Sequence, residues 1–311
     1  MNSKVKSILR IIFYPLLTLK RNYYMHNLRN AVYNNPKKAV DMIWKKSMGH
    51  TIDWEHPRDL NEKISWLMAK TDIKCWARLA DKYYVKEYLN QLGLGEYVPK
   101  LLGVWDDVEK INLKDLPDKF VLKCNHDCGS TYVIDQTTEF DFEEIKKQLK
   151  RHLEKPYGID TVELHYHYIH PVVLAEEFLD NNNSNISSSI IDYKIWCFNG
   201  IPYYCLTCWD RDEDNLSLDL YDIKTWKPMH EYMASEYQNN KIIARPKHLD
   251  TMIYIATKLA QGFPQVRIDL YEVNDKVYFG EMTFTSAGGR MNYFSQKGLT
   301  EMGNLITLPK L

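Results

Sequence analysis

One stretch near the C-terminal end constrains the fold most strongly, because its polar and apolar residues alternate on both sides of a short polar turn. It covers residues 266–284 and reads VRIDLYEVNDKVYFGEMTF. Successive side chains of a β-strand point to opposite faces, so this alternation predicts two strands, 266–271 and 277–284, joined as an antiparallel hairpin. We expect the turn at Asn274-Asp275-Lys276.

One face of this hairpin carries charged groups. With the expected turn, Asp269 lies opposite Glu281, and Arg267 lies opposite Thr283. Two opposed carboxylates repel each other, so we expect a raised pKa for one of them when no metal is bound. Two carboxylates together with nucleotide phosphates are how proteins usually hold Mg²⁺, and a nearby Arg can stabilise a transferring phosphoryl group. The alternative is an acidic face exposed to solvent.

The rest of the chain predicts helices first and strands later. Helical periodicity marks residues 60–68, 75–92, 142–153 and 249–259. Further strands are expected at residues 120–123, 131–134, 172–179, 190–198 and 201–207. Asn199-Gly200, between the last two strands, predicts a two-residue hairpin turn. This order of elements predicts an α+β fold that is mostly antiparallel.

The first candidate for phosphate binding is the loop in residues 120–131, FVLKCNHDCGST. A strand ends at Lys123, and Gly129 and Ser130 lie in the loop that follows. Backbone N–H groups of such a loop can bind phosphate oxygens, and a lysine adds positive charge. The spacing is not that of a Walker loop, and the loop joins two strands, so it would cover phosphates as a flap. The alternative is an ordinary hairpin turn.

Two other strands carry charged pairs. In VVLAEEFL, residues 172–179, Glu176 and Glu177 point to opposite faces, so one of them can accept a hydrogen bond from a ribose hydroxyl or an adenine amine. The alternative there is a solvated strand end. In IDYKIWCFNG, Asp192 and Lys194 share a face. They form either a surface pair that contributes little or a phosphate-binding lysine oriented by its acid.

Charge argues against a dedicated nucleic-acid binder, although the N-terminal segment is basic. The whole chain has 40 Lys and Arg against 41 Asp and Glu, which leaves no basic footprint. Residues 1–40 hold eight basic residues and no acidic one. Their apolar run, Ile11–Leu19, is far shorter than the roughly 20 residues that span a bilayer. The segment predicts either an anchor lying in the plane of a membrane surface or a helix docked on the protein body.

The cysteines indicate neither a disulfide framework nor a zinc site. Six cysteines in 311 residues are sparse. Cys205 and Cys208 have the spacing of half a zinc site, but residues three apart in a strand point to opposite faces. We therefore expect them to pack in the interior, and reduced thiols fit a cytoplasmic location.

In this order, the motifs resemble the ATP-grasp superfamily and, more closely, its TupA-like family, which is named for teichuronopeptide biosynthesis and is sometimes labelled glycosyltransferase. The similarity covers roughly residues 51–311 and is carried by HPRDLNEKISWL, LADKYYVKEYL, FVLKCNHDCGS, AEEFL, DYKIWCFNG, VRIDLY and GEMTFTSAGG. It implies an ATP-grasp fold, in which two α+β subdomains hold ATP, preceded by a helical N-terminal region. We therefore expect a basic amphipathic segment at residues 1–50, a helical subdomain at 51–119 and an ATP-grasp domain at 120–311.

The resemblance also implies roles for individual residues. The expected ATP-binding residues are Lys82, Lys123, Asn125, Gly129, Ser130, Glu176, Glu177, Leu179, Asp192 and Lys194. The expected Mg²⁺ ligands are Asp269, Glu281 and Thr283, of which Thr283 replaces the asparagine usual in the family. The expected catalytic residues are Arg267 and Lys194 beside the reacting phosphate, and Arg290 at the acceptor carboxylate.

The implied activity is that of an ATP-dependent carboxylate–amine ligase of cell-surface polysaccharide biosynthesis. ATP, with Mg²⁺, would phosphorylate a carboxylate such as that of a uronic acid on a glycan, and an amine such as an amino acid would displace the phosphate. The protein would be cytoplasmic, and at the inner face of the membrane if residues 1–40 bind it. Two other classes stay open. A glycosyltransferase would use an Asp-x-Asp motif, for which Asp210-Arg211-Asp212 is the candidate, and a phosphotransferase would use the same ATP-binding residues.

Overall fold

The computed structural model describes residues 3–180, 187–211, 216–238 and 241–310. The α-helices within these ranges are α1 (Ser3–Asn34), α2 (Pro36–Ser47), α3 (Leu60–Lys70), α4 (Lys74–Ala80), α5 (Tyr84–Gln91), α6 (Phe142–Glu154), α7 (Leu249–Leu259) and α8 (Gln296–Asn304). The strands are β1 (Leu101–Trp105), β2 (Lys119–Cys124), β3 (Tyr132–Asp135), β4 (Val173–Glu177), β5 (Asp192–Phe198), β6 (Ile201–Trp209), β7 (Ser217–Asp222), β8 (Gln265–Val273) and β9 (Lys276–Thr283). The 3₁₀ turns used below are η4 (Leu164–Tyr168) and η7 (Ser286–Gly289).

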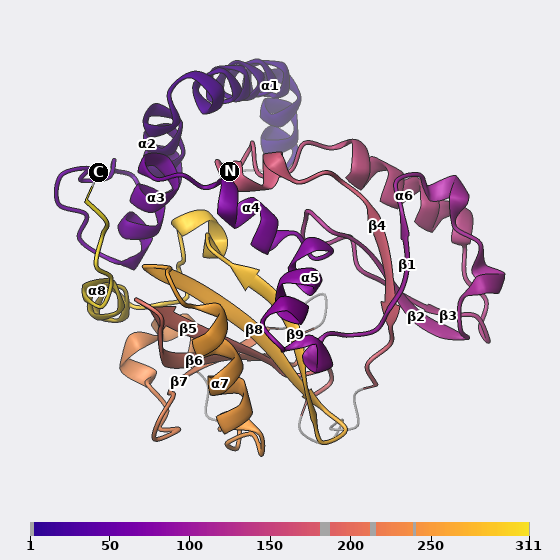
Figure 1. Ribbon diagram of the computed structural model, residues 1–311. Coiled ribbons are helices and arrows are strands. Elements are labelled where there is room, and N and C mark those ends of the chain that lie inside the picture. Colours follow the sequence, from indigo (N-terminus) through magenta and orange to yellow (C-terminus); the bar gives the residue numbers. More distant parts are fainter. Residues whose placement is uncertain (1–2, 181–186, 212–215, 239–240, 311) are drawn as a thin grey trace.

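The strands form two antiparallel sheets; α1, α2 and α3 lie at one end of them, and α4 and α5 run across the middle of the molecule (Figure 1). One sheet has the strand order β1-β4-β2-β3, and the other has the order β7-β6-β5-β8-β9. The expected α+β class is confirmed. β1 lies within residues 51–119, which we expected to be helical, and it pairs with β4. The four-stranded sheet therefore draws on both of the ranges expected as separate domains.

The predicted opposition of the charged residues in the β8–β9 hairpin is confirmed, but the predicted turn is wrong. Asp269 is paired with Glu281, as expected. The turn has two residues rather than three: Val273 pairs with Lys276, and Asn274 and Asp275 have φ angles of +51° and +62°. The extra residue is taken up by a bulge at Gly280, where a Cβ atom would approach Tyr271 to 2.9 Å. Glycine fits this close approach because it has no Cβ.

The single helix expected at residues 75–92 is interrupted, and this was a wrong prediction. Asp81, Lys82 and Tyr83 separate α4 from α5. The Asp81 carboxylate accepts hydrogen bonds from the backbone N–H of Tyr83 (2.8 Å) and from the side-chain amide of Asn125 (2.9 Å). The Lys82 backbone N–H donates to the backbone oxygen of Asn125. These bonds to a distant loop replace helical bonds, so the break depends on tertiary structure.

Hydrophobic cores cover both faces of the five-stranded sheet. Alternate residues of β5 separate as the strand period requires: Ile195 packs on the side of α2, α4, α5 and α7, and Trp196 on the side of α8. Cys205 and Cys208 are buried in these two different cores, and all six cysteines are free thiols. A third core lies between α6 and the four-stranded sheet. The expected interior packing of the two cysteines is what the structure shows.

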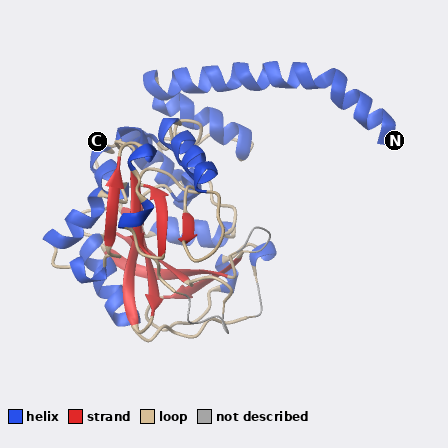
Figure 2. Cartoon of the chain, turned by 90° about the vertical axis from the view of Figure 1, so that its right-hand side faces the viewer, coloured by secondary structure: helices blue, strands red, loops and turns tan. Residues whose placement is uncertain are grey.

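The described contacts between α1 and the rest of the protein are all made by the C-terminal half of the helix. Leu28 and Val32 are buried against the helical core, whereas Leu19 is 67% exposed and Tyr23 is 71% exposed. Figure 2 shows the N-terminal half of α1 reaching away from the rest of the chain. No helix within the described residues has the length and apolar character needed to cross a membrane.

Candidate active site

A cavity of about 930 Å³ lies between the two sheets, and both contribute to its lining. β2 and β4 supply residues from one side, and β5, β6, β8 and β9 supply residues from the other. The loop residues 127–129 and Lys82, from the break between α4 and α5, complete the wall. Charged side chains and apolar ones such as Val121 and Leu206 both face it. The volume and mixed lining are typical of a site for a small, charged organic molecule.

A buried network of charges crosses β5 and β8 at this cavity. Lys194 and Asp269 are register partners on the two strands, and the Lys194 Nζ lies 2.5 Å from Asp269 Oδ2. Lys194 also donates a hydrogen bond to Asp192, two residues before it on the same face. Arg267 donates to both oxygens of Asp269 at 2.7 Å. Asp269, which is 1% exposed, therefore fixes the positions of two cations.

The expectation that repulsion raises the pKa of one carboxylate is wrong for Asp269. Burial raises the pKa of Asp269, but Arg267 and Lys194 outweigh burial and lower it to about 2. The Arg267 Nη2 also lies 3.3 Å from Glu281 Oε1. A guanidinium thus lies between the two opposed carboxylates, so their charges are neutralised without a metal.

Asp192 keeps one oxygen available. Its Oδ2 is bonded to Lys194 and lies 3.7 Å from the Arg211 Nη2. Its Oδ1 is buried and has no hydrogen-bond partner among the described atoms. Burial raises the pKa of Asp192, and although Lys194 opposes this, the net shift is upward. A buried acceptor without a partner is uncommon in folded proteins, and this one belongs to a residue that lines the cavity.

A second charge cluster lies on the four-stranded sheet. Glu176 is bonded through Oε1 to Lys86 (2.8 Å) and through Oε2 to Lys123 (2.5 Å). Burial raises the pKa of Glu176, but the nearby Lys123 and Lys86 lower it by more. The net shift of this pKa is downward, and the carboxylate stays ionised. Glu177, on the opposite face, accepts a hydrogen bond from the Lys100 backbone N–H at 2.8 Å. The carboxylate of Glu176 holds Lys123 at the cavity wall.

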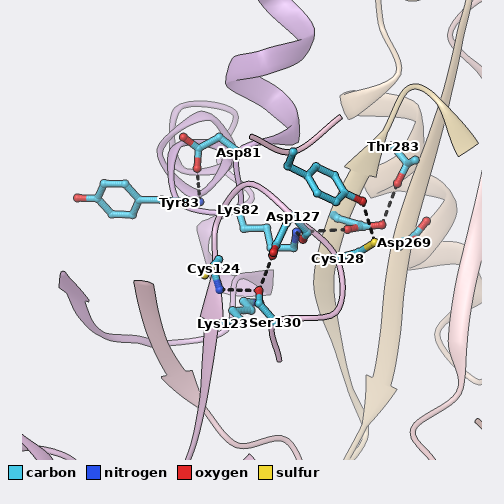
Figure 3. Close-up of polar contacts among 12 residues, drawn as sticks. Asp81, Lys82, Tyr83, Lys123, Cys124, Asp127, Cys128, Ser130, Asp269 and Thr283 are labelled. Carbon is cyan, nitrogen blue, oxygen red and sulfur yellow. Dashed lines mark hydrogen bonds and ion pairs between the residues drawn. The ribbon is translucent and has the colours of Figure 1, made fainter. Parts of the chain in front are cut away.

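The loop between β2 and β3 is held by a bond between two of its own side chains and by side chains from outside it (Figure 3). The Lys82 Nζ donates to the Asp127 backbone oxygen at 2.5 Å. The Asp127 carboxylate is bonded to Ser130 Oγ and to His152 Nδ1. The Cys128 Sγ lies 2.8 Å from the Tyr157 hydroxyl. The loop is therefore ordered over the cavity, as a flap would be.

Most of the residues expected at the site line this one cavity. They are Lys82, Lys123, Gly129, Glu176, Glu177, Leu179, Asp192, Lys194, Arg267, Asp269 and Glu281. The other four of the expected residues are absent from the described lining: Asn125, Ser130, Thr283 and Arg290.

Those four residues contact other parts of the protein. Asn125 joins the loop to Asp81 and to the backbone near β4, and Ser130 accepts a hydrogen bond from the Cys124 N–H. Thr283 donates to Glu281 at 2.9 Å and accepts from Arg267 at 3.1 Å, so it orients both. Arg290 donates to the Gly288 backbone oxygen at 2.6 Å.

Lys86, which is bonded to the lining residue Glu176, and the lining residues Arg211 and Tyr271 were not assigned to the site from the sequence. Lys86 lies four residues after Lys82 in the same matched stretch, which was a usable signal. Arg211 lies inside the Asp210-Arg211-Asp212 motif, which we considered only for its acids. Asp212 falls outside the described residues, and Asp210 accepts a hydrogen bond from the Ser188 N–H. Tyr271, whose pKa is raised by Asp192 and by burial, gave no signal beyond its place on the charged face of β8.

The donor set of the hairpin fits a hard divalent cation that a ligand would help to hold. No group of three or more His, Cys, Asp or Glu suited to a metal occurs within the described residues. Asp269 and Glu281 nevertheless both line the cavity, and Asp192 Oδ1 is an acceptor without a partner among the described atoms. Mg²⁺ prefers oxygen ligands and commonly uses one or two carboxylates plus phosphates. These residues fit Mg²⁺ bound together with a nucleotide.

Comparison with known proteins gives one family match. The model of the family described as TupA-like ATPgrasp matches residues 62–307. No curated protein matches the sequence.

Several solved structures are similar at low identity. D-alanine–D-alanine ligase from Bacillus anthracis complexed with ATP is 13% identical, with 81% of this chain and 63% of that chain covered and a TM-score of 0.38. D-alanine–D-alanine ligase from Helicobacter pylori is 13% identical, with 81% and 68% covered and a TM-score of 0.43. The ATP-grasp ligase PsnB complexed with minimal precursor, Mg and ADP is 13% identical, with 78% and 60% covered and a TM-score of 0.37. The chain thus spans 60 to 68% of the length of these proteins.

Proposed function

The chain belongs to the TupA-like ATP-grasp family, and from this premise we propose that it is an ATP-dependent ligase that joins a carboxylate to an amine. The observation that carries the proposal is the cavity between the sheets. Cationic side chains converge on it from separate parts of the chain: Lys82, Lys123, Lys194, Arg211 and Arg267. Such convergence suits a triphosphate, whose negative charge must be neutralised while it reacts.

The charged residues would divide the work on ATP. Lys123, held by Glu176, and Lys82 lie on the wall below the flap and would bind phosphate oxygens. The apolar lining by Val121, Leu179 and Leu206 would take the adenine ring. The loop residues 127–129 would exclude water from the reacting phosphate.

Asp269 and Glu281 are the residues that would hold Mg²⁺, with Asp192 beside them. When bound, the ion would neutralise charge on the phosphates and fix their orientation. Lys194 and Arg267 are kept in place by Asp269 before any ligand arrives, so they are preorganised to stabilise charge on the transferring phosphoryl group.

The reaction would have two steps. A carboxylate oxygen attacks the γ-phosphorus, the bond to the β–γ bridging oxygen breaks, and ADP leaves with that oxygen. The amine nitrogen then attacks the carbonyl carbon of the acyl phosphate, the carbon–oxygen bond to phosphate breaks, and the nitrogen loses a proton. Positioning and electrostatics would account for most of the rate.

The proposed substrates come from cell-surface polysaccharide biosynthesis. The resemblance to a family named for teichuronopeptide biosynthesis supports a uronic-acid carboxylate on a glycan as the acceptor and an amino acid or amino sugar as the amine.

The test combines ATP, Mg²⁺, uronic-acid oligosaccharides and amino acids with the purified full-length protein. We expect ADP and phosphate in equal amounts, and a product whose mass equals the two substrates less one water. A product that carries phosphate would identify a phosphotransferase, and release of UDP or CMP from nucleotide sugars would identify a glycosyltransferase. Either result would overturn the ligase proposal.

A matched pair of variants tests the site. Lys123→Met removes a lysine of β2 that lines the cavity, and Lys119→Met removes one on the same strand that is exposed outside the lining. We expect Lys123→Met to weaken ATP binding about tenfold or more, since a hydrogen bond to a charged group contributes about 1.5–3 kcal/mol. Lys119→Met should bind ATP as the wild type does.

A further inference from the structure

The N-terminal half of α1 has no role in the site described above, yet its composition is unusual. Figure 2 shows it reaching beyond the body, and Leu19 and Tyr23 are exposed where it leaves the body. The run Ile11–Leu19 contains no charged residue. Exposed apolar side chains such as Leu19 and Tyr23, next to a run without charge, indicate a partner, because large exposed apolar surfaces usually have one.

Charge identifies the kind of partner. Residues 1–40 carry eight basic side chains and no acid, so they hold +8 while the remaining chain holds −9 of the total of −1. Lys20 and Arg21 directly follow the apolar run and are both exposed. Arg10 directly precedes it. Basic residues flanking a short apolar run complement anionic lipid headgroups above an acyl-chain boundary.

We propose that α1 docks on the surface of an anionic lipid bilayer. The uncharged run of Ile11–Leu19 is nine residues, against roughly 20 needed to span a bilayer, so the helix lies in the interface. Apolar side chains enter the headgroup region, and Arg10, Lys20 and Arg21 contact lipid phosphates.

The contacts of the C-terminal half of α1 indicate which side of the protein would face the bilayer. Arg29 of α1 is bonded to Asp160 with a shortest distance of 3.1 Å, and the Tyr33 ring lies 5.5 Å from that of His167 in η4. The Arg290 Nη2 lies 3.4 Å from the backbone oxygen of Thr161, next to Asp160. A bilayer that holds α1 therefore lies on the side of Arg290. If the proposed ligase function holds and Arg290 binds the acceptor carboxylate, this is the side from which a lipid-linked acceptor would reach the site.

The test is sedimentation of the full-length protein with vesicles, without nucleotide or acceptor. We expect binding to vesicles of phosphatidylcholine with phosphatidylglycerol, no binding to phosphatidylcholine alone, and release by high salt. Lys20→Glu/Arg21→Glu should weaken partitioning about tenfold or more, because each basic residue near an anionic surface contributes about a fivefold increase. The charge-matched control is Lys258→Glu/Lys276→Glu. It changes exposed lysines on α7 and at the β8–β9 turn, at the opposite end of the molecule (Figure 1), and should bind as the wild type does.

Three outcomes would overturn the proposal. They are equal binding of the Lys20→Glu/Arg21→Glu variant, salt-insensitive binding to neutral vesicles, and no vesicle binding together with a dimer in light scattering that this variant abolishes. The last result would assign the surface to a second copy of the chain. Thermal melting checks that the variant is folded, and ADP release with a water-soluble acceptor measures the ligase function separately. Loss of vesicle binding with unchanged ADP release supports the docking and leaves the function intact.

Discussion

The ammonium group of Lys82 lies 2.5 Å from the backbone oxygen of Asp127, so the break between α4 and α5 holds the tip of the loop above the candidate active site. The same ammonium lies 4.0 Å from Glu281 on β9. One side chain from the helical region therefore touches both the loop and the five-stranded sheet. A phosphate that binds Lys82 would compete with the loop for its hydrogen bonds.

The first prediction concerns this contact. Lys82→Met should speed amide hydrogen exchange of the loop at residues 127–129, because the bond from Lys82 to the Asp127 backbone oxygen is lost. It should also weaken ATP binding about tenfold, because the proposed charge-assisted bond to a phosphate is lost. Hydrogen exchange with mass spectrometry and calorimetry measure the two effects. Lys74→Met, an exposed lysine of α4, is the control. Unchanged exchange in Lys82→Met would show that the loop does not depend on Lys82.

The second prediction separates the two opposed carboxylates. Asp269→Asn leaves Arg267 and Lys194 buried with less compensation, and we expect a loss of about 3–5 kcal/mol in the free energy of unfolding. The Glu281 side chain is 33% exposed, so Glu281→Gln should cost less than about 1 kcal/mol. Glu281→Gln should nevertheless abolish ADP formation, because it removes a charge that Mg²⁺ needs. Wild-type turnover of Glu281→Gln at limiting Mg²⁺ would contradict the metal assignment.

The third prediction is a pH dependence. The pKa of Asp269 is about 2 in the folded protein, below its ordinary value of 3.8. As the pH falls, the unfolded chain takes up this proton first. The stabilisation that the lowered pKa of Asp269 gives the folded protein is therefore complete above about pH 5 and lost towards about pH 2. Its size is about 2 kcal/mol. In urea unfolding, the difference in the free energy of unfolding between the wild type and Asp269→Asn should become smaller by that amount as the pH falls over this range. A constant difference would argue against a lowered pKa.

The fourth prediction concerns His165, a buried histidine of η4. His165 is fully buried, neither ring nitrogen has a partner among the described atoms, and burial lowers its pKa from 6.5 to about 3. The unfolded chain binds a proton below about pH 6.5 while the folded protein does not, so His165 costs stability as the pH falls from about 7 towards 3. His165→Phe should raise the melting temperature at pH 5 more than at pH 8. Equal changes at both pH values would show that His165 is not held neutral.

The charged face of the hairpin was accessible to sequence analysis because it depends on local alternation. The pairing of Asp269 with Glu281 follows from strand period and an approximate turn, and it is correct even though the turn is one residue shorter. The bulge at Gly280 compensates, and its position depends on the close approach of Tyr271 from the other strand. β1 and β7 were missed, because Gly103 weakens the pattern of β1 and β7 follows a polar stretch.

What could not be predicted is where side chains find partners across the chain. The expected repulsion between Asp269 and Glu281 ignored Arg267, which is two residues away and reaches both carboxylates. Asn125 was assigned to the phosphate loop by its position, yet its amide is bonded to Asp81 and to the backbone near β4. The contacts of Asn125 are set by tertiary packing, on which spacing along the chain carries no information, whereas the spacing of Arg267 and Asp269 was compatible with their bond.

The same Asn125 contacts decide how the site can open. Its backbone and amide join the start of the loop to the α4–α5 break and to Val172 before β4. The four-stranded sheet cannot swing away from the helices without breaking the bonds that join Asn125 to Asp81 and Lys82. The loop tip at residues 127–129 is held chiefly by the side chains of Lys82, His152 and Tyr157. A nucleotide would therefore enter when the loop tip at residues 127–129 moves away from the cavity, while the start of the loop at Asn125 stays in place.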